Sequence, residues 1–243
     1  SMAKRLAKKT IVVTGAASGI GKAVCDLALN EGAFVIGVDS DFNNEPTKFE
    51  KIEGDVRSKL TIETVIQSID ELHGLALIAG ISKPHTPIDQ GTSQDWDDIF
   101  DVNIKSNWTW LTALLPNLKR TKGSSVVMTA SQLAFSGGMN NAPYIASKGA
   151  VVSLAKTAAL ELAEENIRVN VIAPGAIDTP LLKKSLSRSH TPKETEVKSK
   201  ARHAMKRFGT VLEVANGFIY LLSEESSFTT GTVLRIDGGW VVA

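Results

Sequence analysis

The stretch TGAASGIGKA, residues 14–23, decides how the rest of this chain is interpreted. It follows the apolar run 11–13 and leads into a helical pattern, as expected for a strand–turn–helix unit. A glycine-rich turn before a helix can bind phosphate, because the backbone N–H groups of the helix N-terminus point toward the ligand. Three interpretations compete: a triphosphate-binding loop, a dinucleotide-binding loop, and a turn without a ligand.

The triphosphate-binding loop is excluded by two residues. The motif G-x-x-x-x-G-K-[ST] would align its second glycine and its lysine with Gly21 and Lys22. Its first glycine would then fall on Ala16, and the hydroxyl that binds Mg²⁺ would fall on Ala23, which has no side-chain oxygen. The Gly-Lys pair is therefore incidental.

The dinucleotide-binding loop fits three glycines with the spacing G-x-x-x-G-x-G. Gly15 suits the tight turn after the strand, Gly19 the close approach of a pyrophosphate, and Gly21 the close packing of the helix. The spacing alone is a weak signal, since glycine is common at strand–turn–helix junctions. Further residues have to support it.

Asp39, at the end of the second apolar run, gives that support. A carboxylate there can accept hydrogen bonds from both hydroxyls of an adenosine ribose, and it repels a 2′-phosphate. Ser40 and Asp41 follow, and no lysine or arginine is adjacent to bind such a phosphate. The sequence therefore predicts NAD rather than NADP as the cofactor.

Short apolar runs alternate with helical patterns along the whole chain. Unbroken apolar strands are typical of a parallel sheet covered on both faces, so we expect a single doubly wound α/β domain of the Rossmann type, with helices on both faces, over residues 1–243. The expected strands are 10–14, 33–38, 74–79, 124–130 and 168–173, and the expected helices are 19–31, 60–72, 96–118, 144–164 and 211–223.

Tyr144 and Lys148 form a second constellation. Residues four apart share one face of a helix, so the ammonium should favour the phenolate and lower the pKa of Tyr144. Such a tyrosine can exchange a proton with an alcohol or carbonyl oxygen during hydride transfer. Ser131, just past an expected strand, can hydrogen-bond the same oxygen. Asn103 lies inside a helical pattern that disfavours asparagine, which suggests a local disruption of the helix and a bound water.

The chain resembles a classical short-chain dehydrogenase/reductase over most of its length. The resemblance rests on T-G-x-x-x-G-I-G at 14–21, Asp55-Val56, Ala79-Gly80, Asn103, Ser131, Tyr144-x-x-x-Lys148, Pro174-Gly175, Thr179 and the terminal stretch 230–239. It implies that Tyr144 is the general acid/base, that Lys148 lowers its pKa and binds the nicotinamide ribose, and that Ser131 orients the substrate. It further implies that Asn103 holds a water connected to Lys148, and that the protein is a homotetramer or homodimer.

The resemblance also assigns the cofactor-binding residues: Gly15, Ser18, Gly19, Ile20, Gly21, Asp39, Asp55, Val56, Ala79, Gly80, Tyr144, Lys148, Pro174, Gly175, Ile177 and Thr179. Substrate contacts are expected from Ser131, Leu133, Met139, Asn140 and Tyr144. One position departs from the family pattern, because Ile78 replaces the asparagine of N-A-G and cannot make its hydrogen bonds. We expect a cost in stability or a subgroup difference rather than loss of activity.

Composition excludes several other classes. The 27 lysines and arginines nearly balance 26 aspartates and glutamates, which argues against a nucleic-acid-binding protein. Cys25 is the only cysteine and is expected in the core, and the four histidines (His73, His85, His190 and His203) form no metal motif. No segment suits a signal peptide or a membrane span, so we expect a cytoplasmic protein, with Ser1-Met2 left from cloning.

Residues 181–208 interrupt the pattern as a polar segment. Positions 181–207 hold nine lysines and arginines against two glutamates. The segment is interpreted as a substrate lid or, equally well, as a solvated helical excursion, and its charge weakly suggests an anionic substrate. The predicted activity is NAD(H)-dependent interconversion of a secondary alcohol and a ketone. A dehydratase or epimerase that uses the same cofactor, and a non-catalytic NAD-binding protein, are the alternatives.

Overall fold

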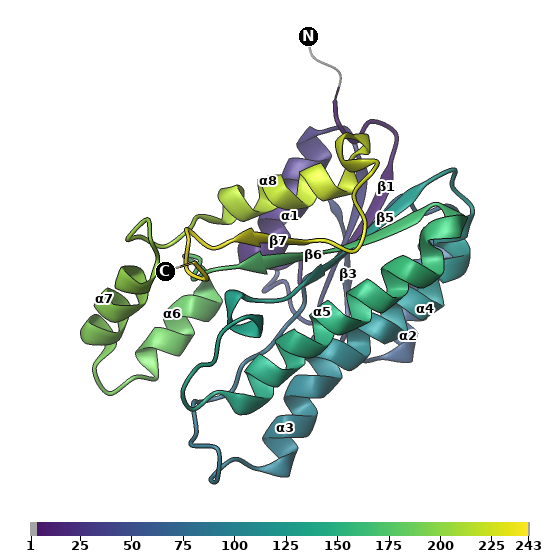
Figure 1. The fold of residues 1–243 in the computed structure, drawn as a ribbon. Coiled ribbons are helices and arrows are strands. Elements are labelled where there is room, and N and C mark those ends of the chain that lie inside the picture. The colour runs from purple at the N-terminus through teal and green to yellow at the C-terminus, as the bar shows by residue number, and fades with distance from the viewer. Residues whose placement is uncertain (1–3, 243) are drawn as a thin grey trace.

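A computed structural model describes residues 4–242 and contains a seven-stranded, fully parallel sheet in the order β3-β2-β1-β4-β5-β6-β7 (Figure 1). The strands are β1 (Thr10–Thr14), β2 (Phe34–Asp39), β3 (Glu50–Glu53), β4 (Gly74–Leu77), β5 (Ser124–Thr129), β6 (Ile167–Pro174) and β7 (Val233–Ile236). The doubly wound fold predicted from the sequence is thereby confirmed.

The central strands are apolar because both of their faces are covered. Every residue of β4 and β5 is buried. Helices α1 (Gly19–Asn30) and α8 (Val211–Leu222) pack on one face, and α2 (Lys59–Ser68), α4 (Ser106–Lys119) and α5 (Ala142–Leu162) on the other (Figure 1). Two hydrophobic clusters, one on each side of the sheet, result from this arrangement.

One edge strand carries no apolar signal. β3 reads EKIE and is largely exposed, since it pairs with β2 on one side only and lies at the edge of the sheet. A strand of this kind lacks the apolar run by which the other strands are recognised.

The predicted helix 96–118 is wrong as one regular helix. The chain forms α3 (Ser93–Phe100), then a π-helical turn over Asp101–Lys105, then α4. The local disruption expected at Asn103 is therefore confirmed, because Asn103 is the middle residue of that turn. The predicted helix 60–72 is also too long, since α2 ends at Ser68.

The strand order reverses next to β1, because β2 lies on one side of β1 and β4 on the other. In an open parallel sheet, ligands bind at the carboxyl ends of the strands beside such a reversal. Two further helices, α6 (Pro180–Ser187) and α7 (Pro192–Arg202), follow β6 and lie together beside the sheet (Figure 1). They form the segment expected to be a lid or a helical excursion.

Ser1-Met2, attributed to cloning, lies outside the described residues. Among residues 4–242, every helix is too short or too polar to span a bilayer.

Candidate active site

The glycine turn after β1 requires a residue without a side chain. Gly15 has φ +74°, a left-handed conformation that other residues rarely adopt, and a Cβ there would lie 2.8 Å from the backbone nitrogen of Ala79. Gly21 has a regular helical backbone, but a Cβ on it would collide with the carbonyl oxygen of Gly15. The first turn of α1 therefore packs directly on the turn that ends β1, as predicted.

This loop fits the phosphates of a dinucleotide. Ser18 is the N-terminal cap of α1, but its side chain makes no capping hydrogen bond. The first N–H groups of a helix need an acceptor, and the positive end of the helix dipole favours an anion there. The loop thus presents backbone donors, rather than a basic side chain, to a pyrophosphate.

Thr14 holds the end of β4 against the glycine turn, a role that sequence analysis missed. Its hydroxyl oxygen accepts hydrogen bonds from the backbone N–H groups of Ile78, at 3.0 Å, and Ala79, at 3.2 Å. The Ile78 side chain packs with the hydrophobic cluster under α1 and α8. Isoleucine is accommodated here because Thr14 satisfies these neighbouring backbone groups and the side chain has apolar neighbours.

Asp39 lies at the end of β2, directly beside the glycine loop. One carboxylate oxygen accepts a hydrogen bond from the backbone N–H of Ala17, at 2.9 Å, and the other accepts one from that of Ser40, at 2.7 Å. A hydrogen bond therefore joins Asp39, which the sequence predicted to bind the ribose, to the loop predicted to bind the phosphates. The Asp39 carboxylate is therefore held at the end of β2, directly beside the glycine loop.

Asp55 and Val56 follow the edge strand β3. The Arg57 guanidinium hydrogen-bonds Asp55, with Nη2 2.8 Å from Oδ2, and this holds the pKa of the carboxyl below its usual range. The carbonyl of Val56 accepts a hydrogen bond from the indole N–H of Trp110, at 2.8 Å. Trp110 is buried in the core, and its indole also fixes the Val56 backbone.

Three predicted catalytic side chains meet where β5 ends and α5 begins. Lys148 is buried; its ammonium donates to the carbonyl of Thr129, at 3.1 Å, and lies 5.6 Å from the centroid of the Tyr144 ring. The Ser131 hydroxyl donates to Oε1 of Gln132, at 2.9 Å, and also hydrogen-bonds Tyr144. Tyrosine, lysine and serine are thus assembled at one strand end, as the spacing predicted.

The prediction that Lys148 lowers the pKa of Tyr144 is wrong for the protein alone. Burial raises the pKa of Tyr144 to about 12, and hydrogen bonding with Ser131 opposes this only in part. Burial likewise lowers the pKa of Lys148 to about 8. The physical reason is the placement of the ammonium, which lies over the ring face and donates to Thr129. Tyr144 is consequently a protonated phenol at neutral pH.

Asn103 fastens the chain after β4 to α5. Its side-chain oxygen accepts from the N–H of Ile81, at 2.8 Å, and its amide nitrogen donates to the Ile81 carbonyl, at 3.0 Å, and to Ser147, at 3.2 Å. The water expected at Asn103 stays a prediction. The backbone carbonyl of Asn103 accepts a hydrogen bond from the side-chain amide of Asn107, at 3.1 Å.

The turn after β6 lies across the glycine loop. Thr179 caps α6 by accepting a hydrogen bond from the N–H of Leu182, at 3.1 Å, and its methyl carbon would be 3.5 Å from a Cβ placed on Gly19. Gly175 is packed against Asp237 and His203, and Ile177 is buried. Pro174, Gly175, Ile177 and Thr179 are therefore brought to the same strand ends as the glycine loop.

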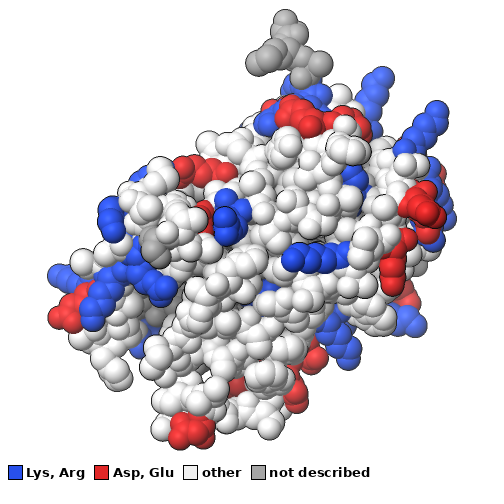
Figure 2. Space-filling model, viewed as in Figure 1, with Lys and Arg blue, Asp and Glu red and all other residues white. Residues whose placement is uncertain are grey.

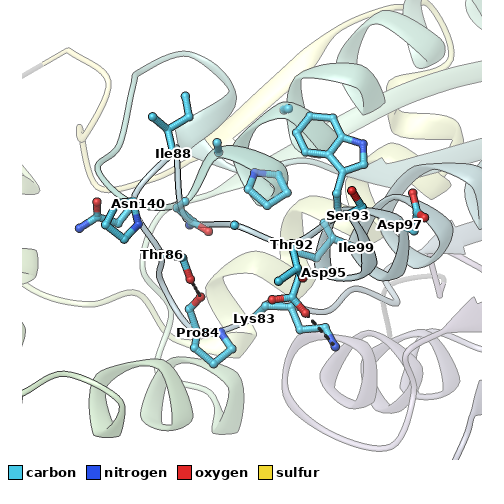
Figure 3. A pocket seen from close by; sticks show the side chains of 17 residues that line it. Lys83, Pro84, Thr86, Ile88, Thr92, Ser93, Asp95, Asp97, Ile99 and Asn140 are labelled. Atoms are coloured by element: carbon cyan, nitrogen blue, oxygen red, sulfur yellow. Dashed lines mark hydrogen bonds and ion pairs between the residues drawn. The ribbon is translucent and has the colours of Figure 1, made fainter.

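The expected substrate contacts are spread more widely. Ser131, Leu133 and Tyr144 cluster near the end of β5, because the Ser131 hydroxyl also accepts from the N–H of Leu133, at 3.1 Å. Met139 is 84% exposed. Asn140 lines a separate cavity of about 550 Å³ between the 83–97 segment and the start of α5 (Figure 3), and its carbonyl accepts a hydrogen bond from the N–H of Thr86, at 2.9 Å.

Cys25 is buried on α1, as expected from the sequence, and burial raises the pKa of its thiol. Within residues 4–242, no group of three histidine, cysteine or acidic side chains could hold a metal ion. Figure 2 shows basic side chains gathered over the region of α6 and α7, in line with the lysines and arginines of that segment.

Known proteins resemble this chain over nearly its full length. A sequence model of the family described as enoyl-(acyl carrier protein) reductase matches residues 15–241. The 3-oxoacyl-[acyl-carrier-protein] reductase FabG of Thermotoga maritima is 34% identical, with 98% of this chain and 100% of that protein covered. The dehydrogenase/reductase SDR family member 6 of Danio rerio is 35% identical, with 97% and 98% covered.

Solved structures also resemble this chain over nearly its full length. Ligand-free aldohexose dehydrogenase of Thermoplasma acidophilum matches with a TM-score of 0.92 at 31% identity, over 100% of this chain and 97% of that one. Levodione reductase also matches with a TM-score of 0.92, at 27% identity, over 98% of this chain and 100% of that one.

Proposed function

This chain belongs to the short-chain dehydrogenase/reductase family, and from that premise we propose that it is an NAD(H)-dependent oxidoreductase that interconverts a secondary alcohol and a ketone. The observation that carries the proposal is the meeting of Ser131, Tyr144 and Lys148 at the end of β5, beside the glycine loop. The family implies oxidoreduction with a nicotinamide dinucleotide. The choice of NAD, the substrate class and the residue roles are our proposals.

Each part of the cofactor has a matching group in the chain. The N–H groups at the start of α1, with Ser18, Gly19, Ile20 and Gly21, would hold the pyrophosphate. Asp39 would bind the adenosine ribose, and Asp55 and Val56 would meet the adenine. Ala79, Gly80, Tyr144 and Lys148 would line the nicotinamide ribose, and the turn with Pro174, Gly175, Ile177 and Thr179 would contact the nicotinamide and the phosphates. When bound, the nicotinamide supplies or accepts the hydride.

The side chains of this site handle the proton. In ketone reduction, the protonated Tyr144 donates its phenol proton to the carbonyl oxygen, which the Ser131 hydroxyl also hydrogen-bonds. In alcohol oxidation the phenolate of Tyr144 takes the hydroxyl proton. Burial disfavours that phenolate in the protein alone. With cofactor bound, the positive charge of an oxidised nicotinamide would add to that of the Lys148 ammonium and favour it.

Asp39 is the residue that we propose selects NAD. Replacing Asp39 with alanine should reduce the preference for NAD over NADP, measured as the ratio of kcat/KM values, by about tenfold or more, because the repulsion of a 2′-phosphate is removed. Asp39→Asn is the matched variant: its side-chain oxygen can still accept from the N–H of Ala17, so the glycine loop stays supported while the charge is lost.

Two outcomes would contradict the role of Asp39. One is a wild-type enzyme that prefers NADPH to NADH. The other is an Asp39→Asn variant that discriminates against NADP as strongly as the wild type does. Asp41→Ala, which removes an exposed carboxylate two positions away, should leave the preference unchanged.

The substrate is best sought among compounds suggested by the relatives and by the charge of the lid. The relatives are named for an aldohexose, for levodione and for a 3-oxoacyl group on an acyl carrier protein, so a panel should contain all three. We propose that residues 181–208 act as a lid whose lysines and arginines favour an anionic substrate. A panel that pairs charged and neutral alcohols of one size tests this, and equal kcat/KM for both would refute the preference.

Domain organisation, assembly and location are proposals as well. We propose that residues 1–243 act as one oxidoreductase domain and that the protein is a cytoplasmic homotetramer or homodimer. Trp108 on α4 and Leu160 on α5 have largely exposed side chains, which suits helices placed at a subunit interface. Light scattering on the purified protein measures the assembly directly.

A further inference from the structure

His203, which showed no motif in the sequence, lies buried at the end of the lid with only 1% of its surface exposed. Its Nε2 is 3.1 Å from the backbone nitrogen of Ala176, and its Nδ1 is 2.8 Å from the carbonyl oxygen of Ser199. The Ala176 N–H can only donate, so Nε2 accepts. Nδ1 therefore carries the proton and donates to Ser199, and both ring nitrogens of a neutral imidazole are used.

Ala176 belongs to the turn 175–179, which we have proposed contacts the nicotinamide and the phosphates. A Cβ on Gly175 would lie 3.0 Å from Nε2 of His203, so the ring packs directly on this turn. The carbonyl of Ala176 accepts from the N–H of Gly209, at 3.0 Å, and the N–H of Asp178 donates to the Gly209 carbonyl, at 2.9 Å. The chain leaving the lid is thus fastened twice to the turn from which the lid begins.

The C-terminal segment packs on the same histidine. The Trp240 ring meets the imidazole edge to face, with centroids 4.8 Å apart and planes at 73°. The N–H of Met205 donates to the carbonyl of Gly238, at 2.9 Å. His203 therefore contacts three parts of the chain at once: the turn 175–179, the end of α7 and the C-terminal segment.

We propose that His203 is a positioning residue that fixes the turn 175–179 in the conformation that binds the nicotinamide cofactor, an inference that rests on the proposed function. Without an acceptor, the half-buried N–H of Ala176 has to turn toward water, which rotates the adjoining peptide and displaces Ile177. Neither α6 nor α7 fully buries a side chain of its own, so the lid has little other packing to restore the turn.

Three substitutions separate this role from simple packing. In His203→Gln the side-chain oxygen can reach the position of Nε2 and accept from Ala176. In His203→Asn the shorter amide can reach Ser199 but not Ala176, and in His203→Phe the aromatic ring remains while both hydrogen bonds are lost. The measurement is the Kd for NADH, with the unfolding midpoint as a record of stability.

We expect the Kd for NADH to stay within about threefold of wild type in His203→Gln and to rise about tenfold in His203→Asn and His203→Phe. His73→Phe is the matched control. His73 also accepts a backbone N–H, that of Thr10 at 3.0 Å, but it lies at the opposite ends of the strands, where β1 and β4 begin. It should lower the unfolding midpoint and leave the Kd for NADH unchanged.

The inference fails if His203→Asn binds NADH as tightly as wild type, or if His203→Gln binds as weakly as His203→Asn. These two polar variants decide the matter even if His203→Phe does not fold. If the wild-type protein binds NADH and all three variants have the same Kd, the role of His203 is refuted and the proposed function is not. A wild-type protein that binds neither NADH nor NADPH refutes the proposed function, and the inference with it.

Discussion

Tyr144→Phe should lower kcat about a thousandfold while leaving the Kd for NADH within about twofold of wild type. The substitution removes only the phenol oxygen, so the ring still packs beneath the Lys148 ammonium, 5.6 Å from the ring centroid. Lys148 also keeps its hydrogen bond to the Thr129 carbonyl, which does not involve the phenol. Binding should therefore survive, whereas the proton has no donor close to the substrate oxygen.

The second tyrosine of the chain supplies the control. Tyr220 lies on α8 and is partly exposed, and Tyr220→Phe should leave kcat and the Kd for NADH unchanged. Steady-state kinetics and direct titration of NADH measure both quantities. A Tyr144→Phe enzyme with near-normal kcat would show that another group transfers the proton.

Gly21→Ala should abolish measurable NADH binding and lower the unfolding temperature. A Cβ at this position collides with the carbonyl oxygen of Gly15 and would lie 2.6 Å from its carbonyl carbon and 3.2 Å from the nitrogen of Ala16. All three atoms are backbone, so the strain cannot be relieved by a side-chain rotation. The first turn of α1 has to move away from the turn that ends β1, and the N–H groups that face the pyrophosphate move with it.

Gly91→Ala is the control for this substitution, because a Cβ on Gly91 would meet no atom within 4 Å. It should keep wild-type NADH binding and a wild-type unfolding temperature. Thermal unfolding followed by circular dichroism, together with NADH titration, distinguishes the two variants. A Gly21→Ala protein that binds NADH with wild-type affinity would contradict the assignment of this loop to the cofactor.

Much of the fold was predictable because its strands are continuous apolar runs. The strand 10–14 was predicted with the bounds that the structure has. It is apolar because it pairs with a strand on each side and both of its faces are covered. β3 was missed because an exposed edge strand with the sequence EKIE shows no apolar pattern. The π-helical turn at Asn103 was expected only as a disruption, because the sequence does not specify the hydrogen bonds from Asn103 to Ile81 and Ser147.

The site was predictable where its residues lie at the carboxyl ends of apolar strands that the sequence reveals, as Asp39 and Ser131 do. Thr14, Trp110 and His203 were missed as site residues because their partners are backbone groups far away in the sequence. The pKa of Tyr144 was predicted in the wrong direction for the protein alone. Helical spacing places Lys148 on the correct face, but it does not reveal that Thr129 takes the ammonium hydrogen bond or how strongly burial acts.

The most direct test of the central claim is the absorbance of the reduced nicotinamide, followed while the wild-type protein is mixed with NADH and the ketone panel, and with NAD⁺ and the matching alcohols. We predict a substrate-dependent change with at least one pair, faster with NAD(H) than with NADP(H), and lost in Tyr144→Phe. Tight binding of NADH without turnover of any ketone or alcohol in the panel would contradict the account and favour a protein that only binds the cofactor.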